Sequence, residues 1–222
     1  MTAYSALQTL VSRDLSDPSR QTFDVDAIKD FIQQGLSAVG RVAPEQFQED
    51  LTPVTGQTVY QLRSTEFSAI PVPEIRLVRV EVWTDIPPRF RFKIKAKAGM
   101  PTRDSIAGWE VWAGSLEIPG IIADLITTND LIRVWGYSPY TPISADDDVV
   151  PVSAELELAI RTFCRVEGLR RLTSSRVLFK QWQARSNNTD VTLGQLNSDL
   201  QVAEDEWRRL SRALKVPEQN PD

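Results

Sequence analysis

The chain has 222 residues, of which 41% are hydrophobic and 25% are charged, and its formal net charge is −5 at pH 7. These fractions are typical of a globular protein with a sizeable core, and the acidic balance argues against a dedicated nucleic-acid-binding protein. The sequence contains no histidine and a single cysteine, Cys164. This composition excludes a serine–histidine triad, a histidine metal site and an internal disulfide framework.

Motifs for catalysis are also missing from the sequence. It contains no phosphate loop, dinucleotide fingerprint, nucleophile elbow or paired-histidine motif. We therefore predict no catalytic, cofactor-binding or metal site and a protein that is not an enzyme. A carboxylate-based hydrolase stays open as an alternative, because such carboxylates leave no sequence signature. The first residues lack the pattern of a signal peptide and no stretch has the length of a membrane span, so we expect a cytoplasm-like compartment.

Residues 1–44 have the pattern of two helices. A short helix is predicted over Tyr4 to Ser12. The second is expected to begin after Asp24, an N-cap residue, and to end near Val42, ahead of Pro44. Both are expected to belong to a helical domain.

Residues 45–138 have the pattern of a β-domain, since short alternating runs are separated by Pro and Gly turns. Together with the flanking helices, this predicts an α+β fold in which a small antiparallel sandwich or barrel is inserted into a helical bundle. The predicted strands are Gln57–Leu62, Ile75–Trp83, Arg89–Lys97, Gly108–Trp112, Ser115–Ile118 and Asp130–Tyr137.

The segment Arg89–Lys97 is called the basic strand here because its polar positions are all cationic. Strand alternation predicts that one face carries Arg89, Arg91, Lys93, Lys95 and Lys97. The other face, directed toward the core, is expected to carry Phe90, Phe92, Ile94 and Ala96. The basic face indicates an edge strand protected by charge, a contact with an acidic partner, or a contact with a polynucleotide backbone. A stacking platform for single strands is disfavoured, because the rings are predicted to lie opposite the charges.

Four of the six tryptophans, Trp83, Trp109, Trp112 and Trp135, lie in the β-domain. Buried core residues are the preferred interpretation, and a carbohydrate platform is the alternative.

Residues 139–150 form a linker with an acidic cluster, Asp146 to Asp148. The spacing does not match a calcium loop, so a solvated turn at the entry of a helix is the preferred interpretation.

Residues 151–216 are predicted to be helical. One helix opens near Ser153, with Glu157 and Arg161 expected to pair on its surface, and a second spans Arg176 to Arg185. The last helix opens with Thr192 and Gln195 as a capping box. Its apolar residues form a heptad seam: Leu193, Leu196, Leu200, Ala203, Trp207, Leu210 and Leu214. The seam requires a facing helix, either the one that opens at Ser153 or one from a neighbouring subunit. Residues 217–222 are expected to be a flexible tail.

The passage from Leu131 to Leu172 carries a resemblance to a known family. A strand, LIRVWGYSPYTP, is followed here by acidic residues and then by a helix, VPVSAELELAIRTFCRVEGLRRL. In this order of its parts, the passage resembles head-to-tail connector (adaptor) proteins of tailed bacteriophages. The order of N-terminal helices (FDVDAIKDFIQQGLSAVGRV), β block and terminal helices is similar too. The long β block departs from compact helical adaptors and resembles the variety with an inserted β-domain.

This resemblance implies a structural protein of the virion neck, assembled in the host cytoplasm. Such adaptors form a ring, commonly twelvefold, between the portal protein and a tail-side stopper or terminator. Double-stranded DNA passes through the lumen without sequence-specific binding. The seam, Val216, Pro217 and the tail would then contact the portal, and the basic strand would face an acidic neighbour or the DNA. A carbohydrate- or receptor-binding β-module is the rival interpretation.

Overall fold

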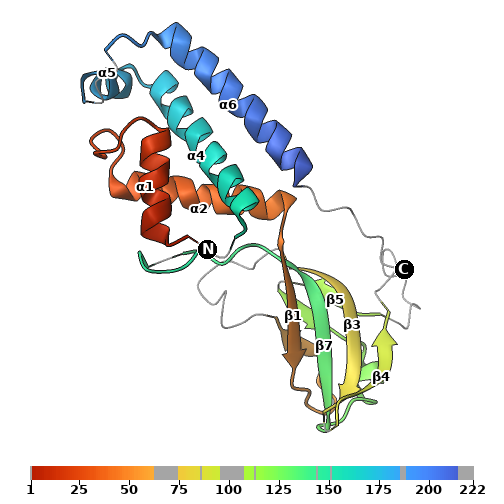
Figure 1. Cartoon of the computed structure of the whole chain (residues 1–222). Helices are drawn as coiled ribbons and strands as arrows, with labels where there is room; N and C mark the ends of the chain where they lie inside the picture. Colours follow the sequence, from red (N-terminus) through yellow and green to blue (C-terminus); the bar gives the residue numbers. More distant parts are fainter. Residues whose placement is uncertain are drawn as a thin grey trace. The chain divides into compact units, whose positions relative to one another are not determined.

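The computed structural model describes residues 2–62, 75–85, 87–95, 108–112, 114–143, 145–150, 152–185 and 189–214 (Figure 1). Within these ranges the chain is α+β, as predicted, with six helices and two antiparallel sheets, neither of which closes into a barrel. The helices are α1 (Tyr4–Asp14), α2 (Val25–Val42), α3 (Gly120–Ala123), α4 (Ala154–Ser174), α5 (Arg176–Arg185) and α6 (Leu193–Ala213). The strands are β1 (Glu45–Leu51), β2 (Val59–Gln61), β3 (Arg76–Thr84), β4 (Arg89–Ile94), β5 (Glu110–Trp112), β6 (Ser115–Glu117) and β7 (Asp130–Ser138).

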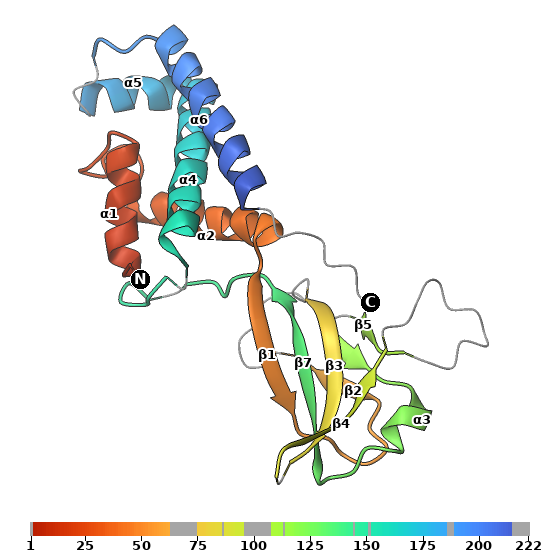
Figure 2. The same cartoon turned by 45° about the vertical axis from the view of Figure 1, so that its right-hand side comes forward.

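The described residues form two compact units. The helical unit combines the chain up to Ala43 with the chain from Pro142 to Leu214, and the β unit is built from Pro44–Thr141. In the helical unit α4 contacts α1, α2, α5 and α6, and α6 runs beside α4 in both views (Figures 1 and 2). Because helices cover α4 on several sides, its buried residues are spread around the helix and do not form a single apolar stripe. Every second residue from Thr162 through Cys164 to Val166 is buried, for example.

Side-chain caps define the starts of the long helices as predicted. The Asp24 carboxylate accepts a hydrogen bond from Ala27 N at the start of α2, at 2.8 Å. The Ser153 hydroxyl accepts from Leu156 N at the start of α4. The capping box of Thr192 and Gln195 is confirmed at the start of α6. Each cap satisfies backbone N–H groups that a helix leaves without an internal partner.

Helix α1 is capped instead by the acidic loop 145–150. Its N-cap residue, Ala3, has no polar side chain. Tyr4 N donates to the Asp148 carbonyl at 2.9 Å, and Ser5 N donates to the Asp146 carbonyl at 3.1 Å. The Asp146 carboxylate also accepts from Lys29 Nζ and from Gln8 Nε2, both at 2.9 Å, and these bonds lower its pKa. The loop therefore joins the two chain segments of the helical unit.

The β unit contains one sheet in the order β1-β7-β3-β4 and another in the order β2-β6-β5. Both contribute to a single apolar cluster, which includes Tyr60 and Leu116 from the small sheet and Val80, Ile132 and Val134 from the large one. The one-turn helix α3 lies at the β4 end of this unit in Figure 2. Along β7 buried and half-buried residues alternate without interruption, as expected of a strand with one face toward a core.

A change of register in β4 makes one part of the sequence prediction wrong. Lys93 is opposite Glu81 and Phe92 is opposite Val82, but the next pair is Phe90 with Trp83, so β4 contains an extra residue at Arg91. Such a bulge reverses the faces of the residues that precede it. Phe90 consequently leaves the core face and is 53% exposed. The basic residues of β4 therefore do not line one continuous face. Ala96 and Lys97 lie outside the described residues.

Two elements were not predicted from the sequence. Strand β1 has the sequence EQFQEDL, in which only Phe47 and Leu51 provide apolar alternation. Among the described strands β1 has one partner, β7, and a strand at the edge of a sheet needs little apolar surface, so its pattern is weak. Helix α3 has four residues, which is too short to produce a helical period.

Candidate interaction surface

The face of the four-stranded sheet that lies opposite the apolar cluster is called the outer face here. Three cross-strand rows build it: Asp50, Arg133, Glu81 and Lys93; Gln48, Trp135 and Arg79; and Leu131, Trp83 and Phe90. The first row crosses all four strands with charges that alternate in sign. Side chains directly opposite one another on adjacent strands interact, so the rows are held together by cross-strand pairs.

Arg133 on β7 is the centre of the first row. Its Nε and Nη2 atoms donate to the two Asp50 carboxylate oxygens at 2.6 and 2.7 Å, a bidentate pair between β7 and β1. These bonds raise the pKa of the guanidinium. The guanidinium carbon also lies 5.1 Å from the centre of the Trp83 ring on β3. One planar cation thus connects three strands, as arginine can do and lysine cannot.

Glu81 on β3 is the buried acid of this face, with 5% of its surface exposed. Arg79 Nε donates to one carboxylate oxygen at 2.6 Å, and the Trp83 indole N–H donates to the other at 2.9 Å. Burial alone would raise the pKa of Glu81, but these bonds outweigh it and hold the pKa below 4.5. Glu81 is therefore an ionised structural acid and lacks the raised pKa that a general acid requires at neutral pH.

Trp135 on β7 is also held by a hydrogen bond and by an arginine that lies over its ring. Its indole N–H donates to Gln48 Oε1 at 3.0 Å, and the Arg79 guanidinium carbon lies 4.2 Å from the ring centre. The Trp83 ring in turn meets Phe90 edge-to-face at 5.7 Å between centroids. The aromatic rings Trp83, Phe90 and Trp135 thus share a face with Arg79 and Arg133. For the basic strand itself, the prediction that rings lie opposite the charges is wrong for Phe90, whereas Phe92 packs against the core as predicted. Arg133 and Arg79 already cover Trp83 and Trp135, so the face is a preformed, internally paired surface.

The residues of the basic strand have separate environments. Arg91 forms an ion pair with Asp130, and its Nη1 atom also lies 3.4 Å from the Leu125 carbonyl oxygen. Arg89 and Lys93 are exposed on β4, and Lys95 follows the strand. The Lys95 and Ile94 carbonyls accept bonds from Trp109 N and its indole N–H, both at 3.0 Å. Among the described strands β4 pairs with β3 alone and lies at an edge of the sheet, in agreement with one of the three sequence interpretations.

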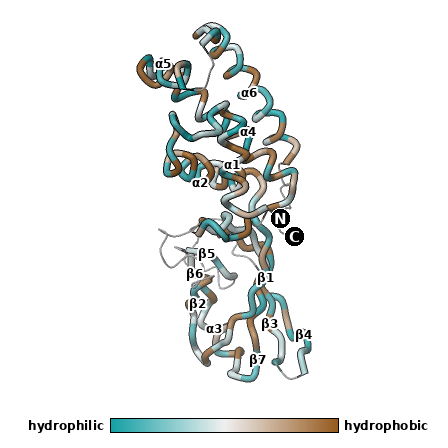
Figure 3. The backbone as a smooth tube through the Cα atoms, turned by 60° about the vertical axis from the view of Figure 1, so that its left-hand side comes forward, coloured by the Kyte–Doolittle hydropathy of each residue, from teal (hydrophilic) through white to brown (hydrophobic). Residues whose placement is uncertain are grey.

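The heptad seam of α6 faces α4 of the same chain. Leu196 and Ala203 are buried, and Trp207 meets Phe163 of α4 edge-to-face at 5.3 Å between ring centroids. Leu200, Leu210 and Leu214 are half-buried, and Leu193 at the helix start is exposed. Polar and apolar residues alternate along α6 in Figure 3, in keeping with this one-sided packing. Val216 and Pro217 lie outside the described residues, so their predicted contact with a portal stays a prediction.

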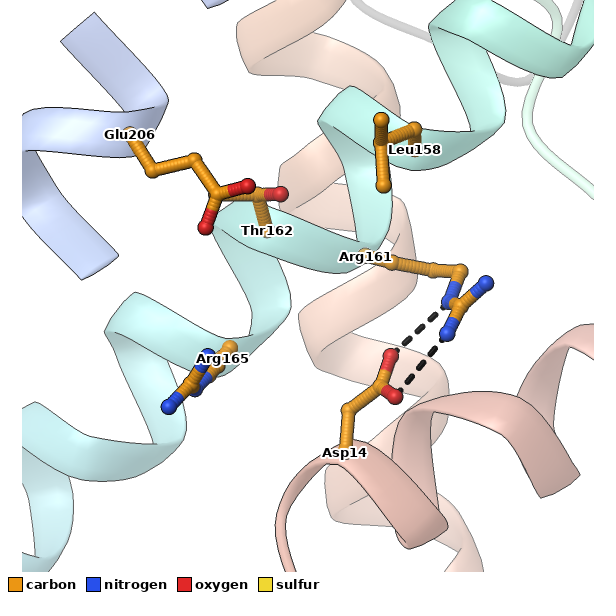
Figure 4. A pocket seen from close by; sticks show the side chains of 6 residues that line it. All are labelled: Asp14, Leu158, Arg161, Thr162, Arg165 and Glu206. Atoms are coloured by element: carbon orange, nitrogen blue, oxygen red, sulfur yellow. Dashed lines mark hydrogen bonds and ion pairs between the residues drawn. The ribbon is translucent and has the colours of Figure 1, made fainter. Parts of the chain in front are cut away.

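A shallow pocket lies on α4 between α1 and α6 (Figure 4). The residues that line it are Asp14, Leu158, Arg161, Thr162, Arg165 and Glu206. Arg161 points toward Asp14, and two hydrogen bonds join them. The pocket combines the Asp14–Arg161 ion pair with the exposed Leu158, and Thr162, Arg165 and Glu206 complete its lining.

The remaining tryptophans divide between core and surface. Trp109 and Trp182 are buried, and the Trp182 indole N–H donates to the Leu15 carbonyl at 3.0 Å. Trp112 on β5 is 73% exposed, opposite Ser115 on β6, which in turn is opposite Gln61 on β2. Of the four tryptophans in the β unit only Trp109 belongs to the core, since Trp83 and Trp135 are half-buried on the outer face and Trp112 is exposed. Core burial, the preferred interpretation for most of the tryptophans, is thus wrong for these three.

Within the described ranges, no group of three or more histidine, cysteine, aspartate or glutamate side chains is placed to hold a metal ion. Among the helices of those ranges, none combines the length and the apolar content needed to cross a bilayer. Comparison with protein-family models finds no match for this chain, and comparison with curated proteins finds none either.

Proposed function

We propose that this chain is a structural subunit of a tailed-bacteriophage neck, an adaptor that forms a ring between the portal protein and a tail-side stopper or terminator. The ring, twelvefold in the resembled family, surrounds the channel through which double-stranded DNA passes. The protein performs no catalysis in this role and is assembled into the virion in the host cytoplasm.

The observation that carries the proposal is the set of chain segments that build the helical unit. It unites helices from both ends of the sequence, α1 and α2 with α4 to α6, and the β unit lies between them in the chain. This is the element order on which the resemblance rests. We propose the finer architecture on the same ground: a bundle of N- and C-terminal helices with a small antiparallel sandwich inserted.

The surface chemistry is compatible with a structural role. Glu81 and Asp130 are buried acids of the β unit, and both have lowered pKa values because arginines and hydrogen-bond donors surround them. Neither acid is poised to transfer a proton near neutral pH. A paired, rigid outer face suits contact with protein neighbours, and a net charge of −5 suits a channel in which DNA must not adhere.

The test is assembly with the portal protein of the same virus. The purified chain, alone and mixed with the portal, is measured by mass photometry and imaged by negative-stain electron microscopy. We expect rings of the chain, and rings stacked on one end of the portal. A chain that forms no ring under either condition contradicts the proposal. Deleting residues 215–222 is expected to weaken portal binding, and full binding by the truncated chain would exclude the tail as a portal contact.

A carbohydrate-binding β-module is the second candidate, and Trp112 favours it. An exposed indole beside hydroxyl and amide groups offers a flat apolar surface with hydrogen-bonding partners at its edge, and Ser115 Oγ lies 3.0 Å from Gln61 Oε1 in the same row. A glycan array decides between the two. Binding that is lost in Trp112→Ala, with no ring formation, would replace the adaptor by this module.

A further inference from the structure

The two edges of the four-stranded sheet carry opposite charges. Strand β1 has three acidic residues, Glu45, Glu49 and Asp50, and no basic one. Strand β4 has three basic residues, Arg89, Arg91 and Lys93, and no acidic one. Among the described strands, β1 pairs only with β7, and β4 pairs only with β3. Each edge therefore directs alternate backbone N–H and C=O groups away from the sheet.

We propose that β1 of one copy of this chain pairs with β4 of the next copy, so that the sheets of neighbouring copies join edge to edge. This inference rests on the proposed ring, for which it names the subunit contact. The partner is a second copy of the same chain, and charge complementarity identifies it.

The opposite charges of the β1 and β4 edges favour one kind of contact between copies over the others. Two β4 edges repel each other through their cations, and two β1 edges repel through their carboxylates. A symmetric dimer through either edge is therefore disfavoured, whereas β1 against β4 is attractive. A contact between two different surfaces of the same chain is head-to-tail, and such contacts generate rings when the rotation between copies closes.

The strand directions permit this contact. Every pairing in the sheet is antiparallel, from β1 to β7, from β7 to β3 and from β3 to β4. Since three reversals separate them, β1 and β4 run in opposite directions. A neighbouring copy in the same orientation therefore presents its β1 antiparallel to β4, and the joined sheet stays antiparallel throughout.

The outer face supplies the register. Its first row, Asp50, Arg133, Glu81 and Lys93, alternates negative and positive charges from β1 to β4. The row begins with a carboxylate and ends with an ammonium group. Placing Asp50 of the next copy beside Lys93 continues the alternation without interruption. After Lys93, the carbonyls of Ile94 and Lys95 already accept hydrogen bonds from Trp109 of the same chain. The contact with the next copy is therefore confined to Arg89–Lys93.

Charge reversal on each edge tests the pairing. One variant, Arg89→Glu with Lys93→Glu, makes the β4 edge acidic. The other, Glu45→Lys with Glu49→Lys, makes the β1 edge basic. Sedimentation velocity and negative-stain imaging, with and without portal, should show that each variant alone loses rings, with self-association weakened at least about tenfold. An equimolar mixture should regain them, because each acidic edge of one variant then meets a basic edge of the other.

A matched control reverses two exposed cations of the helical unit, Arg176→Glu with Lys180→Glu on α5, and should assemble like the unmodified chain. Circular dichroism melting of all variants separates lost assembly from lost folding. A second measurement is oxidative cross-linking of Asp50→Cys with Lys93→Cys in one chain. It should produce a ladder of covalent oligomers, and neither single cysteine variant should do so.

The outcomes separate this inference from the proposed function. The pairing of β1 with β4 is overturned if both charge-reversal variants still form rings, or if the mixture of the two variants does not restore lost rings. Either result leaves the adaptor role unaffected. An unmodified chain that forms no ring, alone or with portal, overturns the adaptor role and the edge contact together.

Discussion

Arg161 of α4 binds Asp14, the last residue of α1, through two parallel hydrogen bonds. Nε donates to Oδ2 at 2.8 Å and Nη2 donates to Oδ1 at 2.9 Å, across 147 positions of the sequence. The main partner of Arg161 is thus Asp14, whereas the predicted partner Glu157 contributes a favourable Coulombic interaction and its Oε2 accepts a bond from the Thr2 hydroxyl at 2.5 Å. The bonds to Asp14 raise the pKa of the Arg161 guanidinium, which therefore stays charged.

Replacing this arginine should weaken the attachment of α1. Both side chains are about a quarter exposed, so solvent screening reduces the ion pair below the value of a fully buried one. We expect Arg161→Ala to lower the free energy of unfolding by about 1–2 kcal/mol, and Arg161→Lys by about 1 kcal/mol because lysine cannot form both bonds. Urea unfolding followed by circular dichroism measures the change. Arg208→Ala, which removes the ion pairs of a largely exposed arginine with Asp205 and Glu204 on its own helix, should change the free energy of unfolding by less than about 0.5 kcal/mol.

Asp130 should give the β unit an acid-dependent stability. Burial alone would raise the pKa of Asp130, but hydrogen bonds from Thr127 and the Arg91 guanidinium outweigh burial and lower the pKa below 3.8. Since the folded-state pKa is lower than the unfolded-state pKa, ionised Asp130 stabilises the fold above about pH 4, and this contribution is lost as the pH falls through the folded-state pKa.

Asp130→Asn tests that dependence. We expect a loss of about 2 kcal/mol at pH 7 that shrinks as the pH falls below about 4, because the unmodified chain then loses the same interaction. Urea unfolding at a series of pH values gives both curves. A constant difference at every pH would contradict the assignment, and Asp124→Asn, at an exposed position, is the control.

Cys164 should be inert in the folded protein. Its thiol is fully buried within α4, and burial raises its pKa, which suppresses the reactive thiolate. We expect a thiol reagent to label the native chain only at the rate at which the helical unit opens, and to label the unfolded chain at once. Because Cys164 is the only cysteine, a single labelling rate reports this opening. Fast labelling that is independent of denaturant would refute the prediction.

Gly136 should not tolerate a side chain. It lies in β7 between Phe47 of β1 and Leu77 of β3. A Cβ atom there would be 2.6 Å from the Arg76 carbonyl oxygen and 3.0 Å from each of the two flanking side chains. The backbone oxygen cannot move cheaply, so Gly136→Ala should cost about 2 kcal/mol in thermal or urea unfolding. Gly120→Ala, where no atom lies within 4 Å, should be close to neutral and is the matched control.

The helical unit is the part that the sequence predicts best. Asp24 and the Thr192–Gln195 box mark helix starts through bonds to residues three positions away, so the signal and its partner lie together in the sequence. The outer face is the part that it predicts least. The sequence does not predict the role of Asp50, because β1 has little apolar alternation and no local pattern pairs Asp50 with Arg133, which lies 83 positions later. The bulge at Arg91 placed Phe90 on the opposite face from the one that simple alternation predicts.

The sequence by itself determined the α+β class, the order of the helices and strands other than β1 and α3, and the starts of α2, α4 and α6, because these depend on hydropathy period and on hydrogen bonds between near neighbours. Only the tertiary structure decided that Arg161 binds Asp14, that α6 packs its seam on α4, and that charges alternate in sign from Asp50 to Lys93 across the sheet. Those relationships join residues far apart in the chain. Strand register determines the row of charges, and a shift of one residue would move each side chain to the other face.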